Sequence, residues 1–272
     1  MTPEAIARVA EALLEAERQG SMLAPITEWL PGFDVASAYA VLGRIEAQRR
    51  AAGWVPVGRK IGFTNRTIWP RYGVDHPMWA HAWRQTVHHA HEGRARLDIA
   101  RFVQPRIEPE IVFGMAGPAP TTDDPEAILR SVVWIAAGFE IVQSHFPDWK
   151  FKLPDCTAAF GLHAALVVGM PVRVTDANRA SLAQRLPTFE VTLRKGDAVL
   201  ERGVGANVLG SPALALAYLA RVLATQPTAP PLLAGEIVTT GTITDAWPVA
   251  RGDVFSSDYG RLDVPGLELA LT

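Results

Sequence analysis

The first part of the chain has the spacing of two amphipathic helices. Apolar residues along 6–14 recur at intervals of three and four, which is the repeat of one helix face. Thr2 provides a capping hydroxyl before this run, and Gly20 lies just past its end. The same spacing returns over residues 34–53. We therefore predict a helical N-terminal segment over residues 1–55.

After residue 55 the pattern changes to short runs rich in β-branched residues and bounded by Gly, Pro or Asp, which is typical of strands. The predicted strands are Val57–Phe63, Arg106–Phe113, Glu140–Ser144, Leu166–Val168, Thr188–Arg194 and Glu236–Thr244, with a hairpin turn at Lys195–Asp197. Two more helices are predicted at Pro125–Ala137 and Pro212–Ala224, and loops at Val87–Leu97 and Thr225–Pro231. Strands with irregular connections, behind early helices, indicate an α+β fold with its main domain over residues 56–272.

Composition and charge exclude several classes of protein. The 272 residues carry a formal net charge of -2, whereas a nucleic-acid-binding protein usually has a basic excess. No run approaches the ~18–20 apolar residues of a membrane span, and the N-terminus lacks the apolar centre of a secretory signal. The single cysteine, Cys156, forms no intrachain disulfide and fits a reducing compartment. We expect a cytoplasmic protein with neither nucleic acid nor membrane as partner.

Three acidic residues are candidates for a metal site. Glu108 and Glu110 alternate along a predicted strand, so their side chains share one face about 7 Å apart. Two such carboxylates repel unless a cation such as Mg²⁺ or Mn²⁺ lies between them, or unless the pair faces water at a strand edge. Glu140 follows the apolar helix predicted to end at Ala137, so it should be coordinated, or paired with an arginine. Together the three acids predict an open metal site with Lewis-acid chemistry.

Lys60 is the first candidate for a catalytic side chain. It lies in a predicted strand between two glycines, which allow a ligand or another backbone to approach closely. A lysine there can bind a carboxylate or act as acid or base, although an exposed lysine on an edge strand is the alternative. Thr240, Gly241 and Thr242 supply hydroxyls and amides that could hold a substrate carboxylate, or they form a plain Thr-rich strand.

These segments follow one another in an order that resembles a known family. The landmarks are Gly58–Thr64, Ile107–Phe113, Phe139–Val142, Asp148–Lys150, Val204–Gly210, Thr240–Thr244, Pro248–Val249 and Arg251–Asp253. The chain resembles the 2-oxopent-4-enoate hydratases and 4-oxalocrotonate decarboxylases of the fumarylacetoacetate hydrolase superfamily. The resemblance implies a mixed β-roll core and a homo-oligomer, or assembly with a related family subunit. It further implies Mg²⁺ or Mn²⁺ on Glu108, Glu110 and Glu140, an active-site lysine at Lys60, and substrate-carboxylate binding by residues 240–244.

Two segments depart from the family pattern. Where relatives carry an acidic loop after the lysine strand, this chain has Trp79–Trp83 with His81 at its centre. His81 is therefore our second catalytic candidate, in place of the acid that moves protons, and packing in a loop or subunit contact is the alternative. The segment Asp155–Ala159 also differs from the family's Asp-Asn-Ala-Ser-Ser-like pattern, which leaves the substrate open.

The residues and the resemblance together lead to a reaction. A 2-oxo acid can chelate a metal through its carboxylate and keto oxygens, and the metal stabilises the enolate that forms. We expect a hydratase that adds water to a small 2-hydroxydienoate in the catabolism of aromatic compounds. A decarboxylase is the first alternative, because decarboxylation uses the same enolate. A C–C bond hydrolase needs a His–Glu pair that the sequence does not place, and a non-catalytic partner subunit has no need for clustered acids.

Overall fold

The computed structural model describes residues 1–72, 74–226 and 229–272. Its helices are α1 (Pro3–Gln19), α2 (Ile26–Trp29), α3 (Val35–Ala51), α4 (Trp69–Tyr72), α5 (Pro125–Leu129), α6 (Leu153–Ala158), α7 (Asp176–Arg185) and α8 (Pro212–Thr225). Within the described residues, none of these helices is long and apolar enough to cross a membrane.

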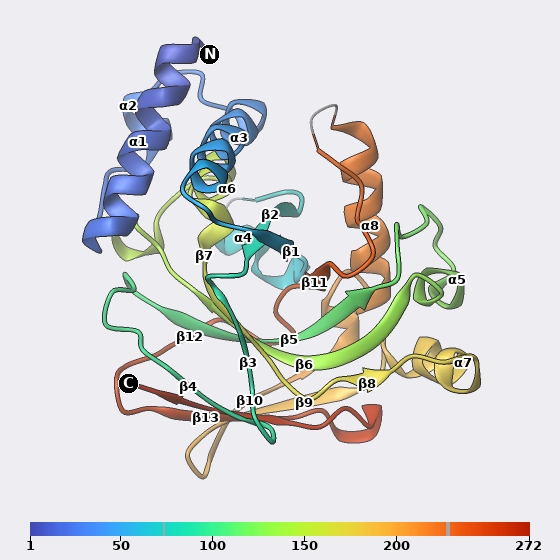
Figure 1. Ribbon diagram of the computed structural model, residues 1–272. Coiled ribbons are helices and arrows are strands. Elements are labelled where there is room, and N and C mark those ends of the chain that lie inside the picture. The colour runs from blue at the N-terminus through green and yellow to red at the C-terminus, as the bar shows by residue number, and fades with distance from the viewer. Residues whose placement is uncertain (73, 227–228) are drawn as a thin grey trace.

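Two β-sheets form the body of the molecule, and the helices gather above and beside them (Figure 1). The larger, nine-stranded sheet contains β1 (Pro56–Gly62), β2 (Met78–Trp83), β3 (Val87–His89), β5 (Arg106–Met115), β6 (Val132–Val142), β7 (His163–Val168), β8 (Val172–Arg173), β11 (Ile237–Thr239) and β12 (Trp247–Pro248). The five-stranded sheet contains β4 (Arg94–Leu97), β9 (Glu190–Lys195), β10 (Ala198–Val204), β13 (Val254–Asp258) and β14 (Leu267–Leu271).

The larger sheet curls around itself and combines both strand directions. Its order is β2-β1-β11-β5-β6-β7-β3, with β1–β11 and β3–β7 parallel and the β5–β6 pair antiparallel. The smaller sheet runs β10-β9-β13-β14-β4 and lies below it in Figure 1. The predicted α+β fold with a mixed β-roll core and N-terminal helices is confirmed.

Strand β5 shows how alternation in the sequence creates two environments. Ile107, Ile111 and Phe113 are fully buried in the main hydrophobic core, which also includes β9, β13, β14 and α8. The intervening Glu108 and Glu110 point to the opposite face, inside the curl of the larger sheet. A small apolar cluster fills this interior further along, and its members are Val112, Ala136, Leu166, Val168 and Ile237. The carboxylates therefore lie at one end of a filled sheet interior.

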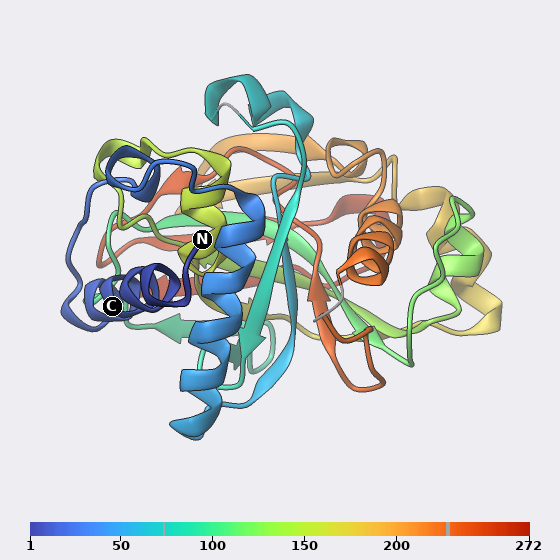
Figure 2. The ribbon, with the colours of Figure 1, turned by 90° about the horizontal axis from the view of Figure 1, so that it is seen from above.

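The N-terminal helices α1 and α3 are confirmed where the sequence predicts them. The Thr2 hydroxyl accepts a hydrogen bond from Ala5 N, and Gly20 ends α1 in the left-handed conformation. The helices share one hydrophobic cluster with residues that follow β6, among them Phe146 and Phe160. Figure 2 shows α3 crossing the strand region from above. The domain boundary between residues 55 and 56 stays a prediction.

Several predicted elements differ from the structure, and the strand predicted over Glu236–Thr244 extends only over Ile237–Thr239, which is β11. The helix predicted over Pro125–Ala137 ends at Leu129, and β6 begins at Val132, because a β-branched and aromatic run pairs with β5. The loop predicted over Val87–Leu97 contains strands β3 and β4, each at a sheet edge. In the loop predicted over Thr225–Pro231, residues 227 and 228 lie outside the described residues. The hairpin between β9 and β10 is confirmed, with Lys195 opposite Ala198.

Candidate metal centre and active site

The three acids that the sequence singles out converge in the fold. Glu108 on β5 lies directly opposite Glu140 on β6, and Glu110 is two residues further along β5. One carboxylate oxygen of each acid lies within 4.8 Å of the others. Glu110 and Glu140 are both 0% exposed, whereas Glu108 is only partly buried and faces a cavity. Long-range strand pairing thus assembles the predicted cluster.

Each buried carboxylate has one oxygen anchored by protein and one that is not. Glu110 Oε2 accepts hydrogen bonds from the Thr239 hydroxyl and from Gly241 N, the latter at 2.7 Å. Glu140 Oε1 lies 2.7 Å from His163 Nδ1. The other two oxygens, Glu110 Oε1 and Glu140 Oε2, have no hydrogen-bond partner in the described part of the chain.

This donor set fits a hard divalent cation. A buried carboxylate oxygen without a partner is costly, and the cost rises when three negative groups lie together. Oxygen ligands from clustered carboxylates are those that Mg²⁺ and similar ions prefer. Glu108, Glu110 and Glu140 would hold the ion, and the open side of Glu108 leaves room for a substrate.

The charges inside the cluster shift one another's pKa values. Burial raises the pKa of Glu108 to about 7, with repulsion from Glu140 added and attraction to Lys60 opposing. Burial and the two neighbouring carboxylates raise the pKa of Glu110 well above its ordinary value. Burial acts in the same direction on Glu140, but Lys60 and His163 outweigh it and lower its pKa. Glu140 therefore carries the cluster's most stable negative charge.

Lys60 projects from β1 into the same cluster and is 2% exposed. Its Nζ donates to the Gly161 carbonyl at 2.9 Å and lies 3.3 Å from Glu140 Oε2. Gly161 has φ of +62°, and a Cβ there would lie 2.9 Å from Ala80 Cβ. Glycine therefore lets the backbone at residue 161 lie this close to β2. Burial would lower the pKa of Lys60, but the three carboxylates outweigh it and raise the pKa. Lys60 is a charged, fixed donor.

A narrow cavity leads to Lys60 and Glu108, with room for only a few water molecules (about 40 Å³). Most of its wall is apolar, and the lining side chains include Phe63, Met78, Val142, Trp149, Phe151 and Leu162. The cavity thus connects the partly exposed Glu108 with the buried part of the carboxylate cluster.

The predicted substrate-binding residues have separate positions. Gly241 and Thr242 line the cavity, but Thr240 is fully buried and its hydroxyl donates to the Ile111 carbonyl at 3.0 Å. Gly241 adopts φ of +96°, and a Cβ there would lie 1.9 Å from Thr64 Oγ1, so only glycine fits. Its amide is already bound to Glu110. These residues shape the metal site, and their contact with substrate stays a prediction.

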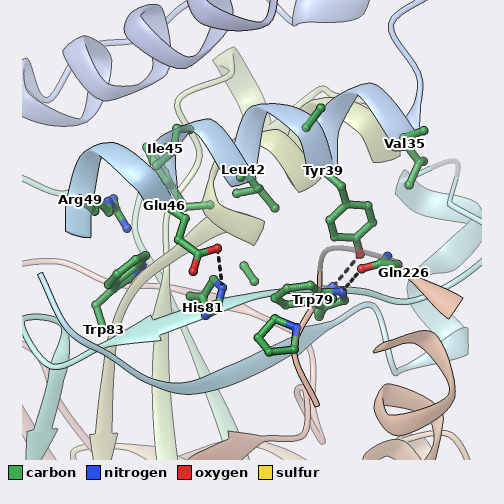
Figure 3. Close-up of a pocket in the computed structure, with 17 residues that line it drawn as sticks. Val35, Tyr39, Leu42, Ile45, Glu46, Arg49, Trp79, His81, Trp83 and Gln226 are labelled. Atoms are coloured by element: carbon green, nitrogen blue, oxygen red, sulfur yellow. Dashed lines mark hydrogen bonds and ion pairs between the residues drawn. The ribbon is translucent and has the colours of Figure 1, made fainter. Parts of the chain in front are cut away.

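His81 lies elsewhere, and the loop predicted around it is wrong. Met78–Trp83 form β2, in which His81 pairs with Arg59 while Ala80 pairs with Lys60. Because alternate strand residues face opposite sides, His81 points away from Lys60. Its Nε2 lies 3.0 Å from Glu46 Oε2 on α3, in the wall of a separate cavity of about 780 Å³ (Figure 3). The structure does not bring His81 to the carboxylates.

The sequence reasoning missed His163 and Thr239, which hold the two buried carboxylates. Thr239 lies on β11, next to β5, and its hydroxyl reaches Glu110 across that strand pair. His163 starts β7 and reaches Glu140 across the β6–β7 pair. Neither has a motif spacing, because each meets its partner only through sheet pairing. A polar residue at the end of an apolar strand was the only available signal.

Comparisons with known proteins identify the family of this chain. The model of the fumarylacetoacetate (FAA) hydrolase C-terminal family matches residues 76–263. The 2-hydroxyhexa-2,4-dienoate hydratase of Comamonas testosteroni is 31% identical over 249 residues, with 90% of each chain covered. A 4-oxalocrotonate decarboxylase from a Pseudomonas species is 33% identical over 251 residues, with 91% of each chain covered.

A solved structure shows the same fold over its full length. The 4-oxalocrotonate decarboxylase from Pseudomonas putida G7, complexed with magnesium and adipate, superposes with a TM-score of 0.88 at 25% identity. The match covers 100% of this chain and 99% of that one. With the carboxylate cluster on the β5–β6 pair, these similarities show that the chain belongs to the fumarylacetoacetate hydrolase family.

Proposed function

We propose that this protein is a divalent-metal-dependent hydratase that adds water to a small 2-hydroxydienoate. The observation that carries the proposal is the cluster of Glu108, Glu110 and Glu140, with two unpartnered oxygens among the described residues, beside buried Lys60. The hydratase relatives at about 30% identity over nearly the whole chain support the same reaction class. A non-catalytic partner subunit has no chemical need for three clustered carboxylates. The cluster therefore disfavours that alternative.

The residues divide the chemistry among them. Mg²⁺ or Mn²⁺ held by the three acids would bind the carboxylate and keto oxygens of a 2-oxo acid and stabilise enolate charge. Lys60 Nζ, which the Gly161 carbonyl holds beside the acids, would donate to the substrate or move a proton. The mostly apolar wall and the burial of Glu110 and Glu140 lower the local dielectric constant, which strengthens charge interactions in the site.

The cavity wall favours hydration over decarboxylation. Among the described residues that line it, Lys60 is the single basic side chain. Arg106 shares the face of Glu108, but its guanidinium carbon lies 4.2 Å from the centre of the Trp149 ring and is stacked there. Phe63, Trp149 and Phe151 therefore suit the uncharged tail of a monocarboxylate. Within the described lining, a second carboxylate would meet no basic side chain other than Lys60.

Decarboxylation of a vinylogous 3-oxo acid is the second candidate. The relative at 33% identity is a 4-oxalocrotonate decarboxylase, and the solved decarboxylase is complexed with the dicarboxylate adipate. The reaction needs the same enolate stabilisation and the same lysine. The preference for hydration consequently rests on the lack of a second basic side chain in the described cavity wall rather than on the metal site.

A C–C bond hydrolase is less favoured by the positions of the histidines. Such an enzyme needs a His–Glu pair that faces the substrate and activates water. His163 pairs with Glu140 and His81 pairs with Glu46, but neither imidazole belongs to the cavity wall that the described residues form. The two pairs are therefore poorly placed to activate water.

A substrate panel tests the proposal. The purified protein with Mg²⁺ receives 2-hydroxypenta-2,4-dienoate, its methyl homologue and the dicarboxylate 2-hydroxymuconate, while ultraviolet absorbance and released CO₂ are followed. We expect loss of the dienoate absorbance without CO₂, abolished by EDTA. CO₂ from the dicarboxylate would favour the decarboxylase, and turnover of neither class would refute both. Lys60→Met serves as the inactive control. A cytoplasmic homo-oligomer stays a prediction.

A further inference from the structure

The register of β6 and β7 directs an unassigned histidine toward the carboxylate cluster. Glu140 pairs with Leu166 and Ile141 with Ala165, but Val142 then pairs with His163 because the register shifts by one residue. Such a bulge turns the following side chain to the other face of the strand. Without the shift, Ala164 would lie opposite Val142, and His163 would face away from Glu140.

The imidazole of His163 is held at both nitrogens. Nδ1 lies 2.7 Å from Glu140 Oε1, and Nε2 lies 2.8 Å from the Thr86 hydroxyl. His163 is 3% exposed. A neutral imidazole that donates from Nδ1 needs a donor at Nε2. The Thr86 hydroxyl, which is also within 3.1 Å of the Trp83 carbonyl, can supply it when its single proton points to the ring. Thr86 itself is fixed in the turn after β2, where its N–H donates to the Trp83 carbonyl at 2.9 Å.

These contacts control which oxygen of Glu140 is available. Oε1 is occupied by His163, so Oε2 remains for Lys60 and for a cation. Glu110 is treated in the same way, since Thr239 and Gly241 occupy Oε2 and leave Oε1. Two independent anchors thus leave each buried acid one oxygen without a hydrogen-bond partner within the described residues, and the one on Glu140 faces Lys60 at 3.3 Å.

We propose that His163, supported by Thr86, is a positioning residue that fixes Glu140 in the orientation required to bind the divalent cation. The proposal rests on the proposed function only for the presence of that cation. A histidine that merely filled the core would leave the affinity of the site unchanged. A positioning histidine preorganises the ligand, and loss of such an outer contact typically costs ~10–100-fold in metal affinity or activity.

The test measures metal binding directly. His163→Phe keeps a buried ring and removes both hydrogen bonds, and titration calorimetry with MgCl₂ gives its Kd. We expect a Kd raised by ~10–100-fold, with kcat at limiting Mg²⁺ reduced and largely restored at saturating Mg²⁺. An unchanged Kd in a folded His163→Phe protein would overturn the proposal.

Two further variants make the result specific. His145 is also a buried histidine, 1% exposed, but its Nδ1 contacts the Ser21 carbonyl, so His145→Phe should leave the Kd unchanged. Thr86→Val removes the hydroxyl behind His163 and should weaken Mg²⁺ binding less than His163→Phe does. If His163→Phe does not fold, Thr86→Val decides: a wild-type Kd would overturn the proposal.

The failure of this proposal is distinguishable from failure of the proposed function. If the wild-type protein binds no Mg²⁺, the metal-dependent function fails before any variant is compared. If the wild type binds Mg²⁺ and hydrates a dienoate while His163→Phe and Thr86→Val match its Kd, only the positioning role fails.

Discussion

The two faces of the β1–β2 strand pair both carry buried charge, but the charges are balanced on only one of them. On the inner face Lys60 meets three carboxylates. On the outer face Glu46 Oε2 lies 3.0 Å from His81 Nε2, and Glu46 Oε1 lies 2.7 Å from Arg50 Nη2. Each oxygen of this carboxylate therefore has a basic partner. Nearby, buried Arg59 pairs with Glu236 at 2.7 Å. The inner face has an excess of negative charge that the outer face lacks.

This difference teaches that unbalanced charge, rather than burial or cavity size, marks the site. The cavity on the outer face measures about 780 Å³, against about 40 Å³ on the inner face (Figure 3). The larger cavity offers no cluster of partially satisfied acids among the described residues, whereas the smaller one adjoins the only such cluster found there. An excess of buried carboxylates is neutralised by a cation or by bound protons, and a balanced pair needs neither.

The largest expected effect comes from removing charge on the inner face. In Glu110→Gln the amide oxygen can still accept from Thr239 and Gly241, but an amide group replaces the unpartnered oxygen. We expect Mg²⁺ affinity to fall by more than the ~100-fold typical of outer contacts, and turnover to be lost. Calorimetry and the dienoate assay measure both. Glu46→Gln, on the outer face, is the matched control, and equal losses in the two variants would contradict the comparison.

Lys60 and Arg59 are adjacent residues on opposite faces, which allows a second matched test. Lys60→Met should lower kcat/KM by ~10²–10⁴-fold, the usual contribution of a positioned acid or base. It should retain Mg²⁺ binding, because it removes a cation that competes for the same carboxylates. Arg59→Lys should affect thermal stability more than kcat/KM. If Lys60→Met keeps the wild-type kcat/KM, the lysine is structural.

When no metal is bound, the stability that Glu108 contributes on the inner face and the stability that Glu46 contributes on the outer face should change with pH in opposite directions. Glu108 has its pKa raised from 4.5 to about 7, so its stabilising contribution is present below pH 4.5 and is lost as pH rises toward 7. Glu46 has its pKa lowered from 4.5 to about 2, chiefly by the hydrogen bond with His81, so its contribution is lost as pH falls below 4.5. Each of the two residues contributes on the order of 1 kcal/mol to the free energy of unfolding, after allowance for its partial exposure.

Thermal melts in EDTA measure this contrast. Glu108→Gln should be more stable than the wild type at pH 8 and similar to it at pH 4. Glu46→Gln should be less stable than the wild type at pH 7, and the difference should shrink by pH 3. Added Mg²⁺ should raise the wild-type Tm at pH 8, because it binds only the folded state. A common pH trend for both variants would refute the contrast.

The smallest effect is expected for His81. Burial lowers the pKa of His81, and its ring faces Glu46 rather than the carboxylate cluster. We expect the pH–rate profile of His81→Ala to overlay the wild type in shape, with a modest loss of thermal stability. A wild-type rate limb between about pH 6 and 7.5 that disappears in His81→Ala would restore the catalytic role considered from the sequence.

Local patterns predicted the elements whose chemistry is local. The caps of α1, the start of α8 at Pro212 and the β9–β10 hairpin each depend on a few adjacent residues, and all three are present. The helix predicted over Pro125–Ala137 is wrong because its apolar run fits the repeat of a buried helix as well as that of a buried strand. Pairing with β5 makes the run from Val132 a strand. A short apolar run does not specify its own secondary structure.

The sequence alone determined the residue types of the site and the common face of Glu108 and Glu110, because alternation along a strand is a local property. Only the tertiary structure decided the remainder. Strand register placed Glu140 opposite Glu108, a bulge turned His163 inward, and the β1–β2 pairing sent His81 outward. A shift of one residue in any strand reverses the face of every side chain on it, and register depends on contacts between segments far apart in the chain.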